Sequence, residues 1–98
     1  MMAEETCVTW HPQAAARLVD DQALIVLTRR GEVLVLNASG TWLWNLLGEA
    51  CRVRDLAGRL AARFRLTETQ ALADVRAFVA SLLEIDAIAE VQSPVFNR

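Results

Sequence analysis

Residues 31–47 read GEVLVLNASGTWLWNLL, and the hydrophobic pattern changes inside this stretch. Val and Leu dominate its first six residues, a composition typical of a β-strand. From residue 39 onward the apolar residues follow a helical period, and Asn37 and Ser39 are both residue types that cap helix N-termini. The stretch therefore predicts a strand that ends near Asn37 and a short first helix over residues 39–47.

Two further strands are expected before this stretch, over residues 16–20 and 22–28. Asp20-Asp21 supplies the turn between them, and a second turn at Arg30-Gly31 leads into the third strand. The third strand is the last of this meander, so we expect it at an edge of the sheet. Edge strands are usually protected by charges, proline or bulges. This one has no proline and carries its only charge, Glu32, at its start, which predicts a little-protected edge.

Helical patterns follow. A second helix is predicted over residues 53–64, and a third helix runs from Thr67 to about Leu83. Thr67 and Gln70 have the spacing of a capping box, in which each side chain bonds the other residue's backbone N–H. A closing strand is expected over residues 87–91.

This order of elements predicts an α+β fold of winged helix-turn-helix type, with a three-stranded antiparallel sheet followed by three helices. The domain is expected over residues 15–91, with a loose arm at 1–14 and a tail at 92–98. Neither the second nor the third strand alternates apolar with polar residues, although helices can cover only one face of such a sheet. The other face must be covered by the arm (Val8 and Trp10 are candidates), by a second copy of this chain or by a bound partner.

Composition argues against several functional classes. The chain has 98 residues, a net charge of −2, and no apolar run of membrane-spanning length, so we expect a cytoplasmic protein without membrane contact. Its two cysteines, Cys7 and Cys51, and its single histidine, His11, are too few for a structural zinc site, and two free thiols are expected. No catalytic pattern is present, which indicates a protein that is not an enzyme and needs no cofactor.

Nucleic-acid binding is an alternative because winged helices often bind DNA through their third helix. Residues 68–86 contain Glu68, Asp74, Glu84 and Asp86 against one basic residue, Arg76. A helix of that sign repels phosphate. DNA binding is therefore kept only as the second hypothesis.

Several residues together resemble the PqqD-like family of RiPP recognition elements, over about residues 15–90. The resemblance rests on a hydrophobic strand that leads into an Asn-x-Ser-Gly turn, on a Trp in the following helix, and on apolar pairs in the second and third helices. These residues are Leu36, Asn37, Ser39, Gly40, Trp44, Leu56, Ala57, Leu60, Ala61, Ala73, Asp74, Val75, Phe78, Leu82 and Leu83. Three departures are Arg52 where a Thr cap is usual, Trp42 where an aliphatic residue is usual, and the absence of glycine from residues 85–87.

The resemblance implies a protein that is not an enzyme and that holds the leader segment of a ribosomally made precursor peptide for a maturation enzyme. The leader would lie antiparallel along the third strand, in a groove walled by the third helix. The implied docking edge is Glu32, Val33, Leu34, Val35 and Leu36, and the implied groove wall is Ala71, Asp74, Phe78, Leu82 and Ile85. Phe78 is the leading candidate for apolar contact, because backbone pairing alone does not offset the cost of ordering a peptide.

Within the family, the sequence of the Asn37 turn, Leu-Asn-x-Ser-Gly followed by a Trp, favours the lasso-peptide type, whose partner is a leader peptidase. The alternative is the PQQ type, a peptide chaperone for a radical SAM enzyme. Arg52, Arg59 and Arg63 line up on the second helix, where they form either a solvated face or a docking patch for an acidic partner. Trp44 is expected in the core, and Trp42 remains open between core and surface. We expect a monomer or a weak dimer.

Overall fold

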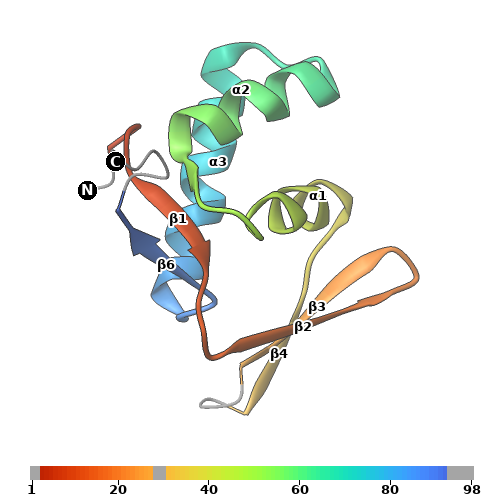
Figure 1. The fold of residues 1–98 in the computed structure, drawn as a ribbon. Coiled ribbons are helices and arrows are strands. Elements are labelled where there is room, and N and C mark those ends of the chain that lie inside the picture. Colours follow the sequence, from red (N-terminus) through yellow and green to blue (C-terminus); the bar gives the residue numbers. More distant parts are fainter. Residues whose placement is uncertain (1–2, 28–30, 93–98) are drawn as a thin grey trace.

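The computed structural model describes residues 3–27 and 31–92, and its elements follow one another as Figure 1 shows. They are β1 (Cys7–Trp10), β2 (Ala14–Val19), β3 (Gln22–Leu27), β4 (Glu32–Val35), α1 (Ala38–Leu46), β5 (Cys51–Arg52), α2 (Val53–Phe64), α3 (Glu68–Glu84) and β6 (Ile88–Val91). The α+β prediction is confirmed. Arg30 of the predicted second turn, Thr28 and residues 93–98 of the predicted tail lie outside the described residues.

The predicted meander forms a three-stranded antiparallel sheet with the order β2-β3-β4. Its first turn is the expected Asp20-Asp21 pair, and both residues have positive φ, at 51° and 65°. Positive φ at both central residues is the geometry of the type I′ hairpin turn, which matches the right-handed twist of the two strands. The sheet thus has β4 at one edge, as the sequence predicts.

A second three-stranded sheet has the order β5-β1-β6, and all of its pairings are antiparallel. The predicted closing strand is confirmed as β6. The prediction of a loose arm is wrong for Cys7–Trp10, because these four residues form the central strand of this sheet. The sequence signal is weak there, since the strands have only four, two and four residues and come from three distant parts of the chain.

The segment before β1 completes the N-terminus of α2. Arg52 is the N-cap residue and makes no side-chain capping bond. The backbone N–H groups of Val53 and Arg54 instead donate to the carbonyl oxygens of Thr6 and Glu4, both at 2.9 Å. Distant backbone therefore satisfies donors that a helix usually satisfies with a Ser, Thr, Asp or Asn side chain.

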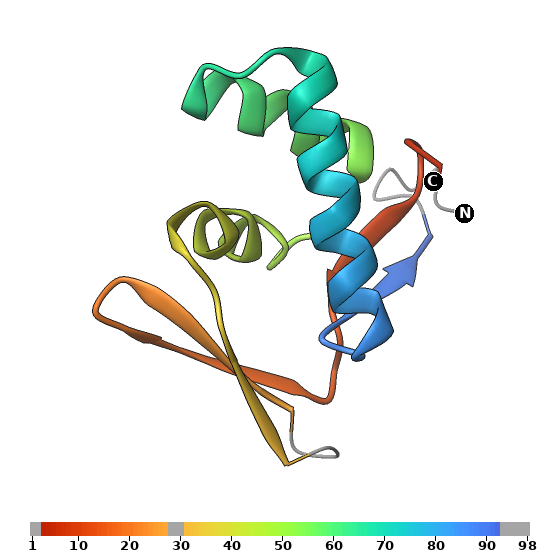
Figure 2. The ribbon, with the colours of Figure 1, turned by 180° about the vertical axis from the view of Figure 1, so that it is seen from behind.

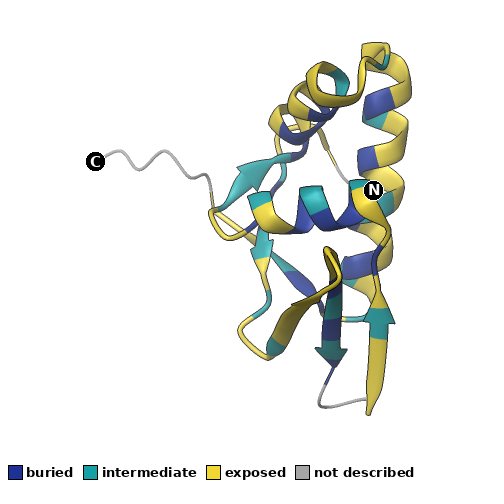
Figure 3. Cartoon of the chain, turned by 90° about the vertical axis from the view of Figure 1, so that its right-hand side faces the viewer, coloured by how far each residue is buried: buried dark blue, intermediate teal, exposed yellow. Residues whose placement is uncertain are grey.

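One hydrophobic core lies between the two sheets and the three helices, and Figure 3 shows the buried residues along the inner sides of these elements. Figure 2 shows α3 running from α2 towards β6, and the buried residues of this helix belong to the core. Its fully buried stripe includes Val75 and Val79. Val8 is also fully buried, so this residue of the predicted arm lies in the core.

The third helix begins as predicted, but its capping box is only half formed. Thr67 is the N-cap residue, and its hydroxyl oxygen accepts a hydrogen bond from the Gln70 backbone N–H at 3.1 Å. The Gln70 side chain donates to Asp74 Oδ1 at 3.1 Å instead of reaching back to the cap. Asp74 is thereby tied to the first turn of α3.

Candidate functional site

The edge of β4 is open in the part of the chain that the structure describes. Residues Glu32–Val35 pair with β3, from Leu27↔Glu32 to Leu24↔Val35, and no described strand pairs with the other side of β4. Val33 and Val35 remain 60% and 54% exposed. A strand of this kind presents unpaired backbone groups and apolar side chains to an incoming segment.

Asn37 joins the end of β4 to the start of α1. Its side-chain oxygen accepts a hydrogen bond from the Gly40 backbone N–H at 2.8 Å, so Asn37 is the N-cap of α1. The Ser39 hydroxyl also donates to this oxygen, at 3.3 Å. The expectation of a cap at Asn37 or Ser39 is confirmed for Asn37.

Gly40 lets the first helix approach the third closely. A Cβ atom at this position would lie 3.1 Å from Asn37 Oδ1, 3.4 Å from Leu36 Cβ and 3.5 Å from Phe78 Cε1. Strand end, helix cap and the Phe78 ring therefore meet at one point, with little space for a side chain between them. The position of Phe78 is coupled to the position of the β4 edge.

Thr41 is a positioning residue that the sequence analysis missed. It is buried, and its hydroxyl oxygen accepts a hydrogen bond from the Ala23 backbone N–H at 2.9 Å. The same hydroxyl donates to the Leu36 carbonyl oxygen at 3.3 Å, while the Leu36 N–H donates to Ala23 O at 2.9 Å. These bonds attach the first turn of α1 to the strands. The available signal in the sequence was a threonine among the apolar residues of the first helix, because a polar group that is buried there needs a hydrogen-bond partner.

A pocket of about 500 Å³ opens beside this junction. This volume lies within the range of about 300–1,000 Å³ that is common for small-ligand pockets. The pocket is lined by the turn after β4 together with α1, by the second half of α2 with the residues that follow it, and by the middle of α3. The lining residues are Asn37, Ser39, Gly40, Leu43, Leu60, Phe64, Leu66, Asp74, Ala77 and Phe78.

The structure separates the predicted groove wall into two sets. Asp74 and Phe78 line the pocket, with Asp74 exposed and Phe78 half-buried. Ala71 and Leu82 are buried, at 0% and 2% exposure, so they belong to the core stripe of α3 and not to its open flank. Ile85 is half-buried against the core and does not line the pocket. The helical wheel placed Ala71 beside the core because it divides a helix into a buried and an exposed side by angle alone, along its whole length.

The tryptophans connect the elements around the site. Trp44 is 3% exposed, which confirms its expected core position, and its ring stacks on Trp10 at a centroid distance of 5.5 Å. Trp10 Nε1 donates to the Trp44 carbonyl oxygen at 2.9 Å, which ties β1 to α1. Trp42 is half-buried and contacts the Phe64 ring edge-on at 5.7 Å.

The outer face of the β2-β3-β4 sheet is apolar and uncovered by any described segment. Val26 of β3 lies between Ala15 and Val33, and Leu24 lies between Arg17 and Val35, so these side chains share one face. The buried residues of β3, Ala23, Ile25 and Leu27, occupy the opposite face. Val8 and Trp10 do not cover the outer face, because β1 belongs to the other sheet.

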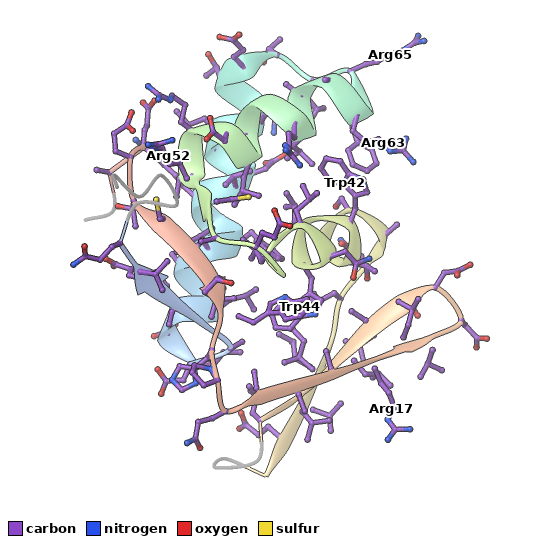
Figure 4. The ribbon with its side chains drawn as sticks, viewed as in Figure 1. Arg17, Trp42, Trp44, Arg52, Arg63 and Arg65 are labelled. Carbon is purple, nitrogen blue, oxygen red and sulfur yellow. The ribbon has the colours of Figure 1, made fainter. Side chains whose placement is uncertain are left out.

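The predicted arginine stripe is not one surface. Arg52 forms ion pairs with Glu5 at 3.1 Å and Asp55 at 3.6 Å, so it serves the fold. Arg59 lines a shallow hollow together with Glu49 and Asp55. Arg63 lies at the far end of α2, where its guanidinium stands over the Phe64 ring, 5.3 Å from the centroid. Figure 4 shows Arg52 and Arg63 at opposite ends of the helix.

The thiols match the sequence expectation. Cys7 and Cys51 are free cysteines, and burial raises the pKa of the Cys51 thiol above its ordinary value. Within residues 3–27 and 31–92, no three His, Cys, Asp or Glu residues are grouped to hold a metal ion. Among the same residues, no helix is both long and apolar enough to cross a bilayer.

Comparison with solved structures defines the class of fold. The chain of "TbiB1 in Complex with the TbiA(beta) Leader Peptide" superposes with a TM-score of 0.76 at 20% identity, over 82% of this chain and 93% of that chain. "Lasso peptide synthetase B1 complexed with the leader peptide" superposes with a TM-score of 0.75 at 24% identity, over 89% of this chain and 99% of that chain. The fold is that of these small α+β proteins.

The sequence itself assigns the family. The family model described as Coenzyme PQQ synthesis protein D (PqqD) matches residues 2–88, most of the chain. A search of curated proteins found no significant match. This chain belongs to the PqqD family.

Proposed function

We propose that this chain binds the leader segment of a ribosomally synthesised precursor peptide and presents it to a maturation enzyme. The leader adds antiparallel to β4 and places apolar side chains beside Phe78. The observation that carries the proposal is the open β4 edge directly beside a pocket walled by α3. Both similar solved structures are complexes with a leader peptide, and one of them is a lasso peptide synthetase B1, which favours lasso-peptide maturation over the PQQ type.

The pocket, more than the edge, accounts for the affinity. Ordering five leader residues costs about 1–2 kcal/mol each in backbone entropy. Two or three new backbone hydrogen bonds return only about 0.5–1.5 kcal/mol each. Burying two or three apolar side chains contributes roughly 1.5–3 kcal/mol apiece and makes the sum favourable. A strand on β4 thus needs the apolar wall around Phe78 to bind measurably.

Strand alternation divides the side chains of the bound leader between two surfaces. Residues opposite Leu34 point to the same side as Leu34, which is packed against the core. Residues opposite Val33 and Val35 point to the outer face. A bound leader would therefore widen the outer apolar face of the sheet, and we propose this face as the docking surface for the maturation enzyme.

The proposal is tested by replacing Phe78 with Ala. The probe is a fluorescently labelled peptide selected on the wild-type protein from a displayed library of random sequences, and it is titrated by fluorescence anisotropy. Loss of the ring removes about 1.5–3 kcal/mol of apolar burial, so we expect roughly ten- to hundredfold weaker binding.

Leu72→Ala is the matched control, because it truncates an apolar residue of the same helix that lines a different hollow, beside Glu4 and Arg54. It should leave the affinity unchanged. Equal affinity of folded Phe78→Ala and wild-type protein would overturn the groove assignment. Tight binding of a labelled DNA duplex, with a steep salt dependence and no leader binding, would favour the DNA-binding alternative.

A further inference from the structure

Two groups of basic residues lie near the two ends of α2, and Arg59 of this helix belongs to neither. Near the start of α2, Arg54 pairs with Glu5 at 2.7 Å, and Arg76 of α3 lies 3.8 Å from Glu4. The N-terminal segment supplies both carboxylates. At the end of α2, Arg63 and Arg65 are exposed and form no ion pair with any residue in the described ranges.

The second group adjoins the pocket. Phe64 lines the pocket and is 37% exposed, and it lies between the Arg63 guanidinium and the Trp42 ring. Arg65 follows at once, in a left-handed conformation with φ of 57°. Figure 4 shows Arg63, Arg65 and Trp42 at the same end of the molecule, above α1. We call these four residues the α2-end cluster.

The direction of the bound leader decides which part of it reaches this cluster. On β4 the antiparallel leader has its N-terminal side at Leu36, since β4 runs from Glu32 towards Leu36. Leader residues ahead of the paired segment therefore leave the edge at Asn37, where the pocket begins. Phe64, at the end of α2, also lines that pocket.

We propose that the α2-end cluster binds an acidic segment of the precursor that precedes the strand-pairing segment of the leader. Arg63 and Arg65 pair with its carboxylates, and the rings of Phe64 and Trp42 contact its apolar side chains. Arginine and tryptophan are the residue types that contribute most to binding at protein interfaces. This inference rests on the proposed function.

The nearby charges also set the order of residues in the leader. Asp74 lines the pocket, so it repels a carboxylate placed inside. Asp74 lies on α3, whereas Arg63 and Arg65 lie at the end of α2. A neutral or apolar residue therefore fits the pocket, and the acidic residues lie beyond Phe64, further from the paired strand.

The test uses a displayed library of random 20-residue peptides, because it needs no knowledge of the precursor. The library is sorted separately on wild-type protein, on Arg63→Glu and on Arg65→Asn, whose side chain tolerates the left-handed conformation. Peptides selected on the wild type should share an apolar alternating core with Asp or Glu enriched on its N-terminal side. That acidic enrichment should disappear on Arg63→Glu and weaken on Arg65→Asn, while the apolar core persists.

Titration of single peptides then measures how much the α2-end cluster contributes to the affinity. The best wild-type peptide, labelled and titrated at low salt, should bind Arg63→Glu about three- to tenfold more weakly, a size expected for exposed ion pairs and a reversed charge. Changing its acidic residues to Lys should restore binding to Arg63→Glu. Arg17→Glu is the control, since it makes the same change in net charge on β2, the opposite edge of the sheet from β4.

The outcomes separate this inference from the proposed function. In one outcome, Phe78→Ala no longer selects peptides with the alternating apolar segment, but Arg63→Glu selects the same acidic residues as the wild type. The α2-end cluster then has no role in binding, and the proposed leader binding stands. If neither variant changes the selection, both proposals fail. Stronger binding of a DNA duplex than of any selected peptide, lost in Arg63→Glu, would assign the cluster to nucleic acid instead. Thermal melting verifies that each variant is folded.

Discussion

Gly40 is the residue at which the strand edge, the first helix and the groove wall are coupled. The space above its Cα is limited by Asn37, Leu36 and Phe78 at 3.1–3.5 Å from a virtual Cβ. A glycine inside a helix normally costs stability relative to alanine. Its presence here is explained by the Asn37 side chain, whose Oδ1 would lie only 3.1 Å from a Cβ, while Phe78 at 3.5 Å would be in ordinary contact with that atom.

Gly40→Val is expected to displace Phe78 and to weaken leader binding about tenfold. Overpacking should also lower the free energy of unfolding by about 1–3 kcal/mol. Anisotropy titration and urea denaturation measure the two effects. Gly58→Val is the matched control, since a Cβ at Gly58 of α2 meets no atom within 4 Å. Wild-type affinity for folded Gly40→Val would show that Phe78 is positioned independently of α1.

Single residues were predictable where the local chain determines their role. Asn37 and Thr67 cap helices because their side chains reach backbone N–H groups three residues ahead, and that spacing is visible in the sequence. Gln70 departed from its predicted bond because Asp74, four residues ahead, offered a charged acceptor. The full burial of Ala71 was not predictable, because the burial of a residue beside the core stripe depends on how α3 packs, which the periodicity does not contain.

At the scale of elements, the segment before β1 replaces the missing cap of α2. Backbone carbonyls of Glu4 and Thr6 accept from the helix N-terminus, and Glu5 pairs with both Arg52 and Arg54. The unusual Arg at the cap position thus has a local explanation. Carboxylates close to a helix N-terminus are also favourable for the helix dipole.

Glu5→Gln should therefore destabilise the protein by about 0.5–1 kcal/mol at low salt, because it removes two ion pairs that are partly exposed. The loss should shrink at high salt, where such pairs are screened. Urea denaturation at two salt concentrations checks this. Glu90→Gln is the control, as Glu90 is exposed on β6 and forms no ion pair with a described residue. A salt-independent loss would assign the effect of Glu5 to something other than charge.

The helices and the meander were predictable as elements because each has its own hydrophobic period. The β5-β1-β6 sheet was not, since four residues at 7–10 and two at 51–52 have too little pattern to indicate a strand. What makes them strands is pairing over long sequence separations, Cys7 with Arg52 on one side and with Val91 on the other. Such pairing has no local signature.

At the scale of the whole molecule, the sequence predicted that both faces of the β2-β3-β4 sheet need a covering partner. It did not identify what covers the outer face. The lack of alternation in β3 and β4 required a partner for both faces. The core covers one face, and in the structure no described segment covers the other. The remaining candidates are a second copy and a bound partner, and the composite surface formed with the bound leader favours the maturation enzyme.

Val26→Lys places a charge in the middle of this face. We expect unchanged leader affinity, because Val26 points away from the groove. We also expect at least tenfold weaker docking of a maturation enzyme on this face, because a buried unpaired charge is costly. Fluorescence anisotropy measures the leader affinity, and the rate of leader processing measures the docking of the maturation enzyme. Ala62→Lys, on the exposed side of α2, is the control for added charge. Processing at the wild-type rate by Val26→Lys would locate the docking surface elsewhere.

The pairing of β1 with β6 has a practical consequence for joining this domain to others. Cys7 lies directly opposite Val91, so a covalent linker attached ahead of β1 or behind β6 would start from almost the same point. That point belongs to the sheet that does not contain β4. A reporter or an enzyme joined ahead of β1 or behind β6 would thus start from the same side of the domain, away from the open β4 edge.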